Sequence, residues 1–257
     1  MLLTPIRALG RNIIDFVEKL GGLVLLTGGI LSESRTVIRD RRLILEQMEA
    51  IGVKSLPLVV VTSVFTGAVA SWQAAYQFEG FVSLTYLGGA TSIAIFMELA
   101  PVLTALVLAG RVGASIAAEL GTMRVTEQID ALESLAISPV RYLVMPRFWA
   151  TVTMLPALTI FANVIALGGA YVVANLLLDV HTHMFFESVQ QFFRLRNVFG
   201  GLAKALAFGT SIAVVGCYVG INTSGGAEGV GRATIEAFVL SAILILLNDY
   251  ILAMLIF

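Results

Sequence analysis

Residues 110–139 read GRVGASIAAELGTMRVTEQIDALESLAISP, a polar segment between two long apolar stretches. The residues of its first part, 112–118, are small and apolar. This pattern predicts a helix that continues from the preceding apolar stretch into the polar segment. From 118 to 135 the spacing predicts an amphipathic helix, ended by Pro139. Its apolar side would hold Leu120, Met123, Ile129, Leu132 and Leu135. A patterned connection of this length favours a docking role, although a plain surface helix stays the alternative.

The composition places the chain in a membrane. Hydrophobic residues make up 58% of the sequence and charged residues only 13%, whereas about a quarter of a soluble domain is charged. The net charge of -1 gives no basic field for nucleic acid. Because Cys217 is the single cysteine, the chain can form no intrachain disulfide. These numbers exclude an ordinary water-soluble or nucleic-acid-binding domain.

Five segments have the length and apolarity that a spanning helix needs, which is about 20 residues. They cover residues 55–78, 81–110, 148–178, 205–223 and 237–257. In the first of them, Gly67 and Ser71 form a small-xxx-small pair that allows another helix to approach closely. The fold class predicted is an all-α membrane protein with about five transmembrane helices, forming one domain over residues 1–257.

The first 31 residues predict a helix of a different kind. Arg7 and Arg11 precede an apolar run, as in a signal peptide, but Asp15, Glu18 and Lys19 interrupt it and a charged segment follows. Apolar residues recur at helical spacing beside these charges, which is typical of a helix lying in the membrane interface. The apolar run at 21–31 is too short to span. We therefore expect residues 1–31 to be interfacial or re-entrant.

The distribution of lysine and arginine predicts the orientation, because these residues gather on the cytoplasmic side of spans. Half of the sixteen lie at or before Lys54. The segments at 32–54, 110–139 and 225–232 are then cytoplasmic. The connection from Asp179 to Lys204 is assigned to the outer side.

Two acids fall inside predicted spans. Glu98, followed by the helix-kinking Pro101, is the only charge between residues 81 and 110, and Asp249 lies in the last span. A carboxylate in an apolar span costs several kcal/mol unless it is paired, protonated or hydrated. Such acids favour a functional role over packing alone. They also keep open a second class, a secondary transporter that uses Glu98 and Asp249 as proton sites.

Other chemistries find little support. Asp179, His181 and His183 are the best candidates for a metal site, but no fourth ligand is near in sequence, and we expect no metal. The glycine-rich segment 222–236 lacks GK[ST] and GxGxxG, so it predicts a turn and a helix start. With no Walker motif and no nucleophile–base set, we expect neither a catalytic residue nor a cofactor in this chain.

Two stretches carry a resemblance to a known family. MELAPVLTALVLAGRVGASIAAELGTMRVTEQIDALESLAISPVRYLVMPR (97–147) and SGGAEGVGRATIEAFV (224–239) resemble the MlaE (YrbE-type) permeases. These are membrane subunits of ABC systems that move lipids together with MCE-domain proteins. The resemblance extends over nearly the whole chain. It implies a transporter permease rather than an enzyme, in a multi-pass bacterial inner-membrane location that agrees with an N-terminus unlike a transit peptide.

The resemblance implies a set of partners. Residues 118–135 would be a coupling helix docking into an MlaF-like ATPase, which binds the ATP and Mg. The residues that match the coupling motif are Glu119, Gly121, Thr122, Met123, Arg124, Thr126, Glu127, Gln128 and Asp130. Two permeases would pair, an MlaD-like MCE ring would sit on the outer side, and a STAS-domain regulator is an optional further partner.

A lipid path between the two permeases is also implied, with Gln73, Tyr76, Glu98 and Pro101 along it. The family often has Arg-Glu-Leu-Gly-Pro where this chain has Met97 to Pro101. The missing arginine puts a role of Glu98 through that pair in doubt. The function predicted is ATP-driven transfer of lipid to or from an MCE protein. Phospholipid is the family's commonest association, though relatives handle sterols and other lipids. An ion-coupled transporter and a scaffold or membrane anchor, which would need no intramembrane acids, are the alternatives.

Overall fold

The computed structural model describes residues 3–37 and 39–256, and these residues form helices and turns without a strand. In chain order the α-helices are α1 (Leu3–Glu33), α2 (Arg41–Ile51), α3 (Leu56–Phe78), α4 (Leu87–Ala94), α5 (Ala100–Leu108), α6 (Ala114–Val125), α7 (Gln128–Ser134), α8 (Met145–Leu177), α9 (Thr182–Phe192), α10 (Leu195–Ile221) and α11 (Gly226–Ile256). Three π-helical segments lie between them, at Ile95–Leu99, Ala109–Gly113 and Val140–Val144.

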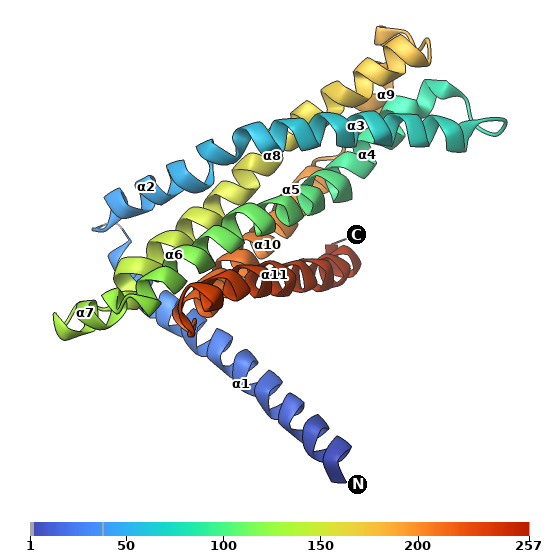
Figure 1. The fold of residues 1–257 in the computed structure, drawn as a ribbon. Coiled ribbons are helices and arrows are strands. Elements are labelled where there is room, and N and C mark those ends of the chain that lie inside the picture. Colours follow the sequence, from blue (N-terminus) through green and yellow to red (C-terminus); the bar gives the residue numbers. More distant parts are fainter. Residues whose placement is uncertain (1–2, 38, 257) are drawn as a thin grey trace.

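Five helical stretches of the described chain are long and apolar enough to cross a membrane by length and composition. They are Arg41–Phe78, Leu84–Val125, Val140–Leu177, Leu195–Ile221 and Gly226–Ile256. Figure 1 shows them running side by side, with α8 between α3 and α10, and with α11 beside α10 and α6. The predicted all-α membrane class with five spans is confirmed.

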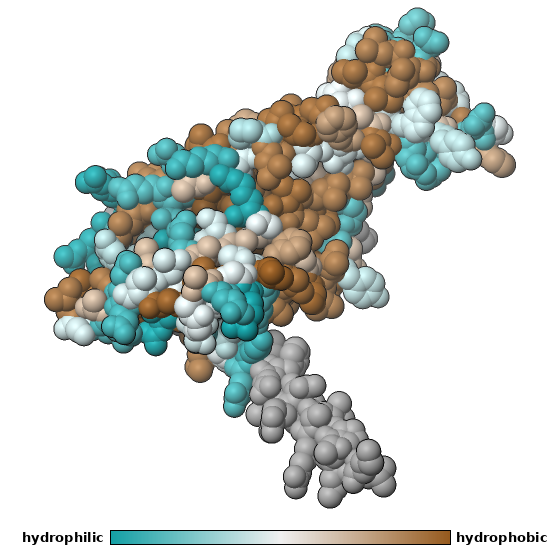
Figure 2. Space-filling model, viewed as in Figure 1, coloured by the Kyte–Doolittle hydropathy of each residue, from teal (hydrophilic) through white to brown (hydrophobic). Residues whose placement is uncertain are grey.

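The bundle has two polar ends. We call the end that carries α2, α7 and the turn between α10 and α11 the basic end, and the end that carries α9 and the turn after α3 the far end (Figure 1). Figure 2 shows brown, apolar residues over the middle of the bundle and teal, polar residues gathered at the basic end. This banding is typical of a protein whose middle lies in lipid.

The closest helix packing is between α3 and α8. A Cβ added at Gly67 would lie 1.7 Å from the carbonyl oxygen of Ala166, and one at Gly169 would lie 2.4 Å from that of Val64. Ser71 is fully buried in the same interface. The pair Gly67 and Ser71 therefore permits the close approach that its spacing predicts.

The helix of the second span is longer than the predicted 81–110. Helical backbone runs from residue 87 to 125, through two π-helical segments, and continues from the apolar phase into the polar segment without a turn. A similar extension affects the third span, where helix begins at Val140 rather than at 148. The predicted bounds stop beside the charges Arg111 and Arg147, whereas the helices continue past them because their backbone hydrogen bonds do.

The N-terminal element is one continuous helix. α1 runs for 31 residues and leaves the basic end of the bundle at an angle (Figure 1). No turn interrupts α1 between Leu3 and Glu33, and the re-entrant alternative for residues 1–31 stays a prediction. Lys19 Nζ forms an ion pair with Glu236 Oε1 of α11 at 2.5 Å, which ties α1 to the bundle. The interfacial placement stays a prediction.

The last two spans also begin earlier than predicted. α10 starts at Leu195 and α11 at Gly226, against expected starts of 205 and 237. Gly225 and Gly226 have positive φ angles of 91° and 68°, which only glycine adopts readily, and they make the turn between the two helices. The assignment of Lys204 to an outer connection is wrong, because this residue lies inside α10. The sequence misleads here because Arg194 and Arg196 make the preceding stretch polar.

Candidate functional site

Three charged side chains meet inside the bundle, and we call them the ionic triad: Glu98, Lys204 and Asp249. Lys204 Nζ donates a hydrogen bond to Glu98 Oε1 and lies 3.0 Å from Asp249 Oδ1. The second contact is an ion pair by distance but is not aligned as a hydrogen bond, so Asp249 Oδ1 accepts none from the described residues. Two carboxylates thus share one ammonium group in an apolar bundle.

Local sequence brings these groups together. Glu98 lies on the π-helical segment Ile95–Leu99, where the extra residue in the turn changes the direction of the side chains. α10 approaches this segment at Gly201, where a Cβ would lie 2.2 Å from the Phe96 carbonyl oxygen and 3.1 Å from Pro101 Cγ. Lys204 follows one helical turn later, so the close approach at Gly201 places its ammonium beside Glu98.

The triad extends from the interior to the surface of the protomer. The Lys204 side chain is 0% exposed, that of Asp249 is 22% exposed and that of Glu98 is 41% exposed. Lys204 lies nine residues into α10, which is roughly 14 Å from the far end of that helix. A polar ligand that reaches Glu98 from this surface would therefore contact a charged group well inside the apolar band.

The four predicted lipid-path residues do not form one site in this protomer. Glu98 belongs to the ionic triad and Pro101 is buried beside Gly201. Tyr76 lines a separate pocket near the far end of α3, and Gln73 is exposed on the same helix. Glu98 has Met97 before it instead of the arginine often found in the family, and its cationic partner in this fold is Lys204 of α10.

The polar segment 118–135 is two helices rather than one. α6 ends at Val125 and α7 begins at Gln128, and Glu127 between them has a left-handed φ of 58°. This corrects the single amphipathic helix expected from the apolar spacing. The apolar spacing itself survives the break, since Leu120 and Ile129 are both buried. Arg124 and Asp130 form an ion pair across the junction and hold α7 against α6.

α7 projects from the basic end, away from the other helices (Figure 1). Its C-terminus has a Schellman motif, in which the Ala136 N–H bonds the Glu133 carbonyl and the Ile137 N–H bonds the Leu132 carbonyl. Leu135 is 70% exposed just beyond the helix. A short helix with a fixed end and an exposed apolar tip is a rigid surface suited to a partner protein.

The nine predicted coupling residues all lie on or beside α6 and α7. Those with exposed side chains are Glu119, Thr122, Thr126, Glu127, Gln128 and Asp130. Met123 and Arg124 are half-buried, and Gly121 is buried where α6 meets the turn before α11. A Cβ at Gly121 would lie 3.0 Å from Thr223 Oγ1, so this glycine serves packing within the chain.

The Glu119 side chain contacts a second helix of the same chain. Arg147 Nη2 at the start of α8 donates to Glu119 Oε2 at 3.0 Å, and Arg147 Nη1 donates to the Leu143 carbonyl at 2.9 Å. The Arg147 side chain is 7% exposed and that of Glu119 is 51% exposed. The ion pair therefore joins the middle of α6 to the start of α8.

Two further contacts join the basic end to other helices. Arg111, on the π-helical segment Ala109–Gly113, donates to Ser55 at the start of α3. Arg141 donates from Nε and Nη2 to the two carboxylate oxygens of Asp40, at 2.9 and 3.2 Å. Such bidentate arginine–carboxylate pairs fix geometry as well as charge. Helices α3, α6 and α8 are thus linked by polar contacts where α7 projects.

Sequence reasoning missed two functional candidates, Lys204 and Arg147. Lys204 was assigned to the outer connection, and Arg147 lies just before the predicted span 148–178; both are buried. The sequence GGLAKALAF (200–208) could have indicated that Lys204 is buried, because small and apolar residues lie on both sides of the lysine. Among the described residues no group of three or more metal-binding side chains occurs, and His183 Nδ1 lies 3.3 Å from Glu187.

A bundle of five apolar helices, with a charged cluster inside and a polar helix projecting from one end, defines a polytopic membrane protein of the transporter type. The family model described as Permease MlaE matches residues 44–255, from α2 to α11. The chain therefore belongs to the MlaE permease family, as its two motifs predict.

Relatives of the chain carry consistent names. It is 42% identical over 240 residues to a probable ABC transporter permease protein of Synechocystis, covering 93% of this chain and 91% of that protein. It is 39% identical over 257 residues to a similarly named protein of Rickettsia typhi, covering 100% and 99%. It is 31% identical over 258 residues to the intermembrane phospholipid transport system permease protein MlaE of Haemophilus influenzae, also covering 100% and 99%.

Proposed function

We propose that this chain is the membrane permease subunit of an ATP-driven lipid transporter. The observation that carries the proposal is the family match over residues 44–255, since it includes both the ionic triad and α7. The names of the relatives support an ABC permease, and that of the Haemophilus protein supports phospholipid as the cargo class. The ATPase belongs to a partner chain, and this chain acts as the lipid-handling subunit.

The triad is suited to an amphipathic cargo. Acyl chains need apolar walls, which the spans supply, and a headgroup needs a few polar contacts. Glu98 offers such a contact because its side chain is 41% exposed while its partner Lys204 is fully buried. Headgroup and triad would meet in the space between two permease copies. We therefore infer a homodimer in which each protomer turns Glu98 toward a shared lipid path.

ATP energy would enter through α7. A nucleotide-binding partner that docks on α7 moves α6, because the two helices are joined by the Arg124–Asp130 ion pair. α6 passes the displacement to α8 through Glu119 and Arg147. α6 continues into α5 through the π-helical segment Ala109–Gly113, which leads back toward Glu98. A change at the basic end can thus alter the surroundings of the triad.

The partners proposed here are those that the family resemblance implies. An MlaF-like ATPase, which holds ATP and Mg, would dock on α7, and an MlaD-like MCE protein would receive or deliver lipid at the far end. The membrane would be the bacterial inner membrane, with the basic end in the cytoplasm. A STAS-domain regulator is an optional further partner. This chain would hydrolyse nothing itself.

The test is mass spectrometry of the tagged chain purified gently from its native membrane, recording co-purified chains and bound lipids together. The proposal predicts an ATPase, an MCE protein and a specific lipid class. A chain that purifies alone, even after cross-linking, would overturn the proposed assembly. An ion-coupled transporter that uses Glu98 and Asp249 would then take its place, since acids inside spans also serve proton transfer.

A further inference from the structure

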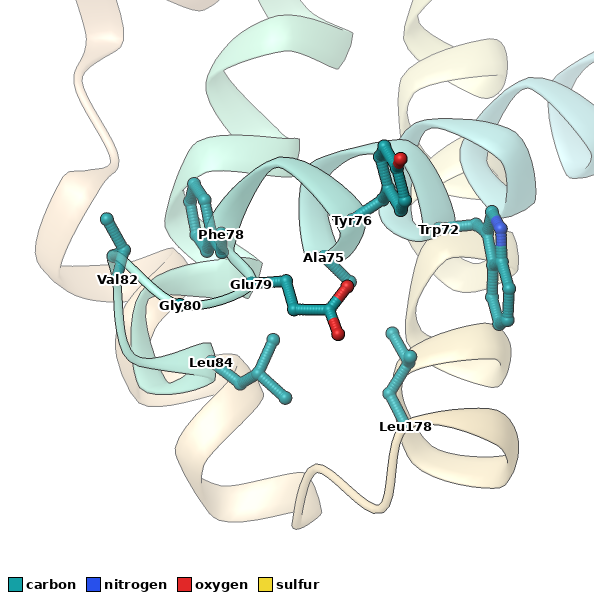
Figure 3. A pocket seen from close by; sticks show the side chains of 9 residues that line it. All are labelled: Trp72, Ala75, Tyr76, Phe78, Glu79, Gly80, Val82, Leu84 and Leu178. Carbon is teal, nitrogen blue, oxygen red and sulfur yellow. The ribbon is translucent and has the colours of Figure 1, made fainter.

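A pocket at the far end of the bundle is separate from the ionic triad. It has a volume of about 440 Å³ and is lined by Trp72, Tyr76 and Phe78 of α3, by Glu79 and Leu84 of the following turn, and by Leu178 after α8. Neither Glu98 nor any other member of the triad lines it. Figure 3 shows the Glu79 carboxylate turned into the space between Leu84 and Leu178.

Local backbone geometry places this carboxylate. α3 ends at Phe78, and Glu79 leaves the helix with an extended ψ of 121°. Gly80 follows with a φ of 80°, a left-handed conformation that glycine adopts without strain. The N–H groups of Phe81 and Val82 both bond the Phe78 carbonyl and close the turn. The chain thus reverses sharply and leaves Glu79 beside the last turn of α3.

The pocket lies where a lipid headgroup would lie. The first spanning stretch ends at Phe78, so Glu79 is at the boundary between the apolar band and the far polar end. Trp72 and Tyr76 are 54% and 71% exposed. Exposed Trp and Tyr near the end of a span are typical of the membrane interface. A lipid whose acyl chains lie along α3 would hold its headgroup at the level of Glu79.

The lining selects the charge of that headgroup. Among the described residues, no lysine, arginine or histidine forms an ion pair with Glu79. Its carboxylate is an acceptor only, and it attracts an ammonium group and repels a purely anionic headgroup. The faces of Trp72 and Tyr76 add attraction for a cation where the pocket holds it against them.

We propose that this pocket binds the amine headgroup of a phosphatidylethanolamine-type lipid at the far membrane interface, with Glu79 as the counter-ion and Trp72 and Tyr76 as the aromatic walls. The site goes beyond the proposed transport function, because it lies outside the triad and needs no ATPase. The lipid binds at the far end of the bundle, and it binds there without any partner chain.

Fluorescence of Trp72 tests the proposal directly. The chain has two tryptophans, so the Trp149→Phe variant reports on Trp72 alone. It is placed in nanodiscs with a digalactosyldiacylglycerol host, which carries no ammonium group that could compete for the pocket. Phosphatidylethanolamine or phosphatidylglycerol with brominated acyl chains is titrated in as the quencher. We expect the ethanolamine lipid to associate about two to five times more strongly, the range of an exposed ion pair. Glu79→Gln should reduce this ratio to about one.

The matched control is Glu187→Gln, which neutralises another exposed carboxylate at the far end, on α9, and should leave the preference intact. Equal association of the two lipids with the native pocket, or a preference that survives Glu79→Gln, overturns the proposal. Native mass spectrometry, which counts bound lipids of each class, tests the same preference without the Trp149→Phe substitution. It compares the unaltered chain with Glu79→Gln. Neither outcome touches the ATP-driven function, because no partner chain is present.

Discussion

Arg147 on α8 and Glu119 on α6 are 28 positions apart, and their side chains meet at 3.0 Å where the bundle reaches its basic end. Arg147 is buried and also donates to the Leu143 carbonyl, so two hydrogen bonds together orient its guanidinium. The contact joins the helix that carries α7 to the longest helix of the bundle. It gives the proposed coupling a defined route from the basic end into the spans.

Replacement of Arg147 by methionine should separate folding from coupling. The variant loses two donated hydrogen bonds, one of them to a charged group, and we expect a loss of about 1–3 kcal/mol in stability. The half-exposed Glu119 regains water, which limits the loss. In the reconstituted complex, ATP hydrolysis should continue while lipid transfer falls.

The matched control for that variant is Arg42→Met. Arg42 forms an exposed i,i+4 pair with Glu46, with side chains 92% and 59% exposed. Such pairs contribute little, so the change should be within about 0.5 kcal/mol and transfer should be unaffected. If Arg147→Met and Arg42→Met behave alike in the transfer assay, the Glu119–Arg147 contact is not part of the coupling route.

The ionic triad predicts a strong asymmetry between partial and complete neutralisation. Lys204→Met leaves Glu98 and Asp249 without their shared cation, and removal of one partner from a buried pair costs about 3–5 kcal/mol. We expect this variant to show a much lower melting temperature in detergent, measured by size-exclusion chromatography after heating.

Neutralisation of all three groups should restore folding. The triple variant Lys204→Met, Glu98→Gln and Asp249→Asn buries no unpaired charge, so its stability should return to within about 1–2 kcal/mol of the native chain. Lipid transfer should remain low because the headgroup contact is absent. A triple variant as unstable as Lys204→Met would show that the triad is not an electrostatic unit.

The spans could be predicted from sequence because about 20 apolar residues in a row have few alternatives to a membrane helix. Lys204 could not be placed in the same way. Its partners lie 106 and 45 positions away, and a single sequence contains no signal of that proximity. The helix break at Glu127 was equally hidden, because glutamate rarely adopts a left-handed φ and the apolar spacing continues across it.

Ala136 offers a test of the backbone at the end of α7. It holds the left-handed position of the Schellman motif with a φ of 58°, where glycine is preferred. Ala136→Gly should therefore raise stability by about 1 kcal/mol, measured as a shift in melting temperature. A decrease would mean that the left-handed position is not strained in the native chain.

The proposed docking of an ATPase on α7 predicts that their association is sensitive to charge. Glu127→Lys reverses an exposed charge between α6 and α7, and it should weaken association with the ATPase partner while the melting temperature of the isolated chain stays unchanged. Association is measured by co-purification over a salt series. Glu187→Lys makes the same charge change at the far end and should leave association intact. Undiminished binding of the ATPase by Glu127→Lys would show that α7 is not part of the interface with it.

Lipid transfer in proteoliposomes tests the central proposal most directly. The chain is reconstituted with the proposed ATPase and MCE partners. Movement of labelled phospholipid to the MCE protein is followed with and without ATP, with and without a proton gradient, and in the native chain and Glu98→Gln. We predict transfer that requires ATP, persists without a proton gradient, and falls about tenfold in Glu98→Gln while the complex stays assembled. Transfer driven by the gradient in the absence of ATP, and lost in Glu98→Gln, would contradict this account and identify an ion-coupled transporter.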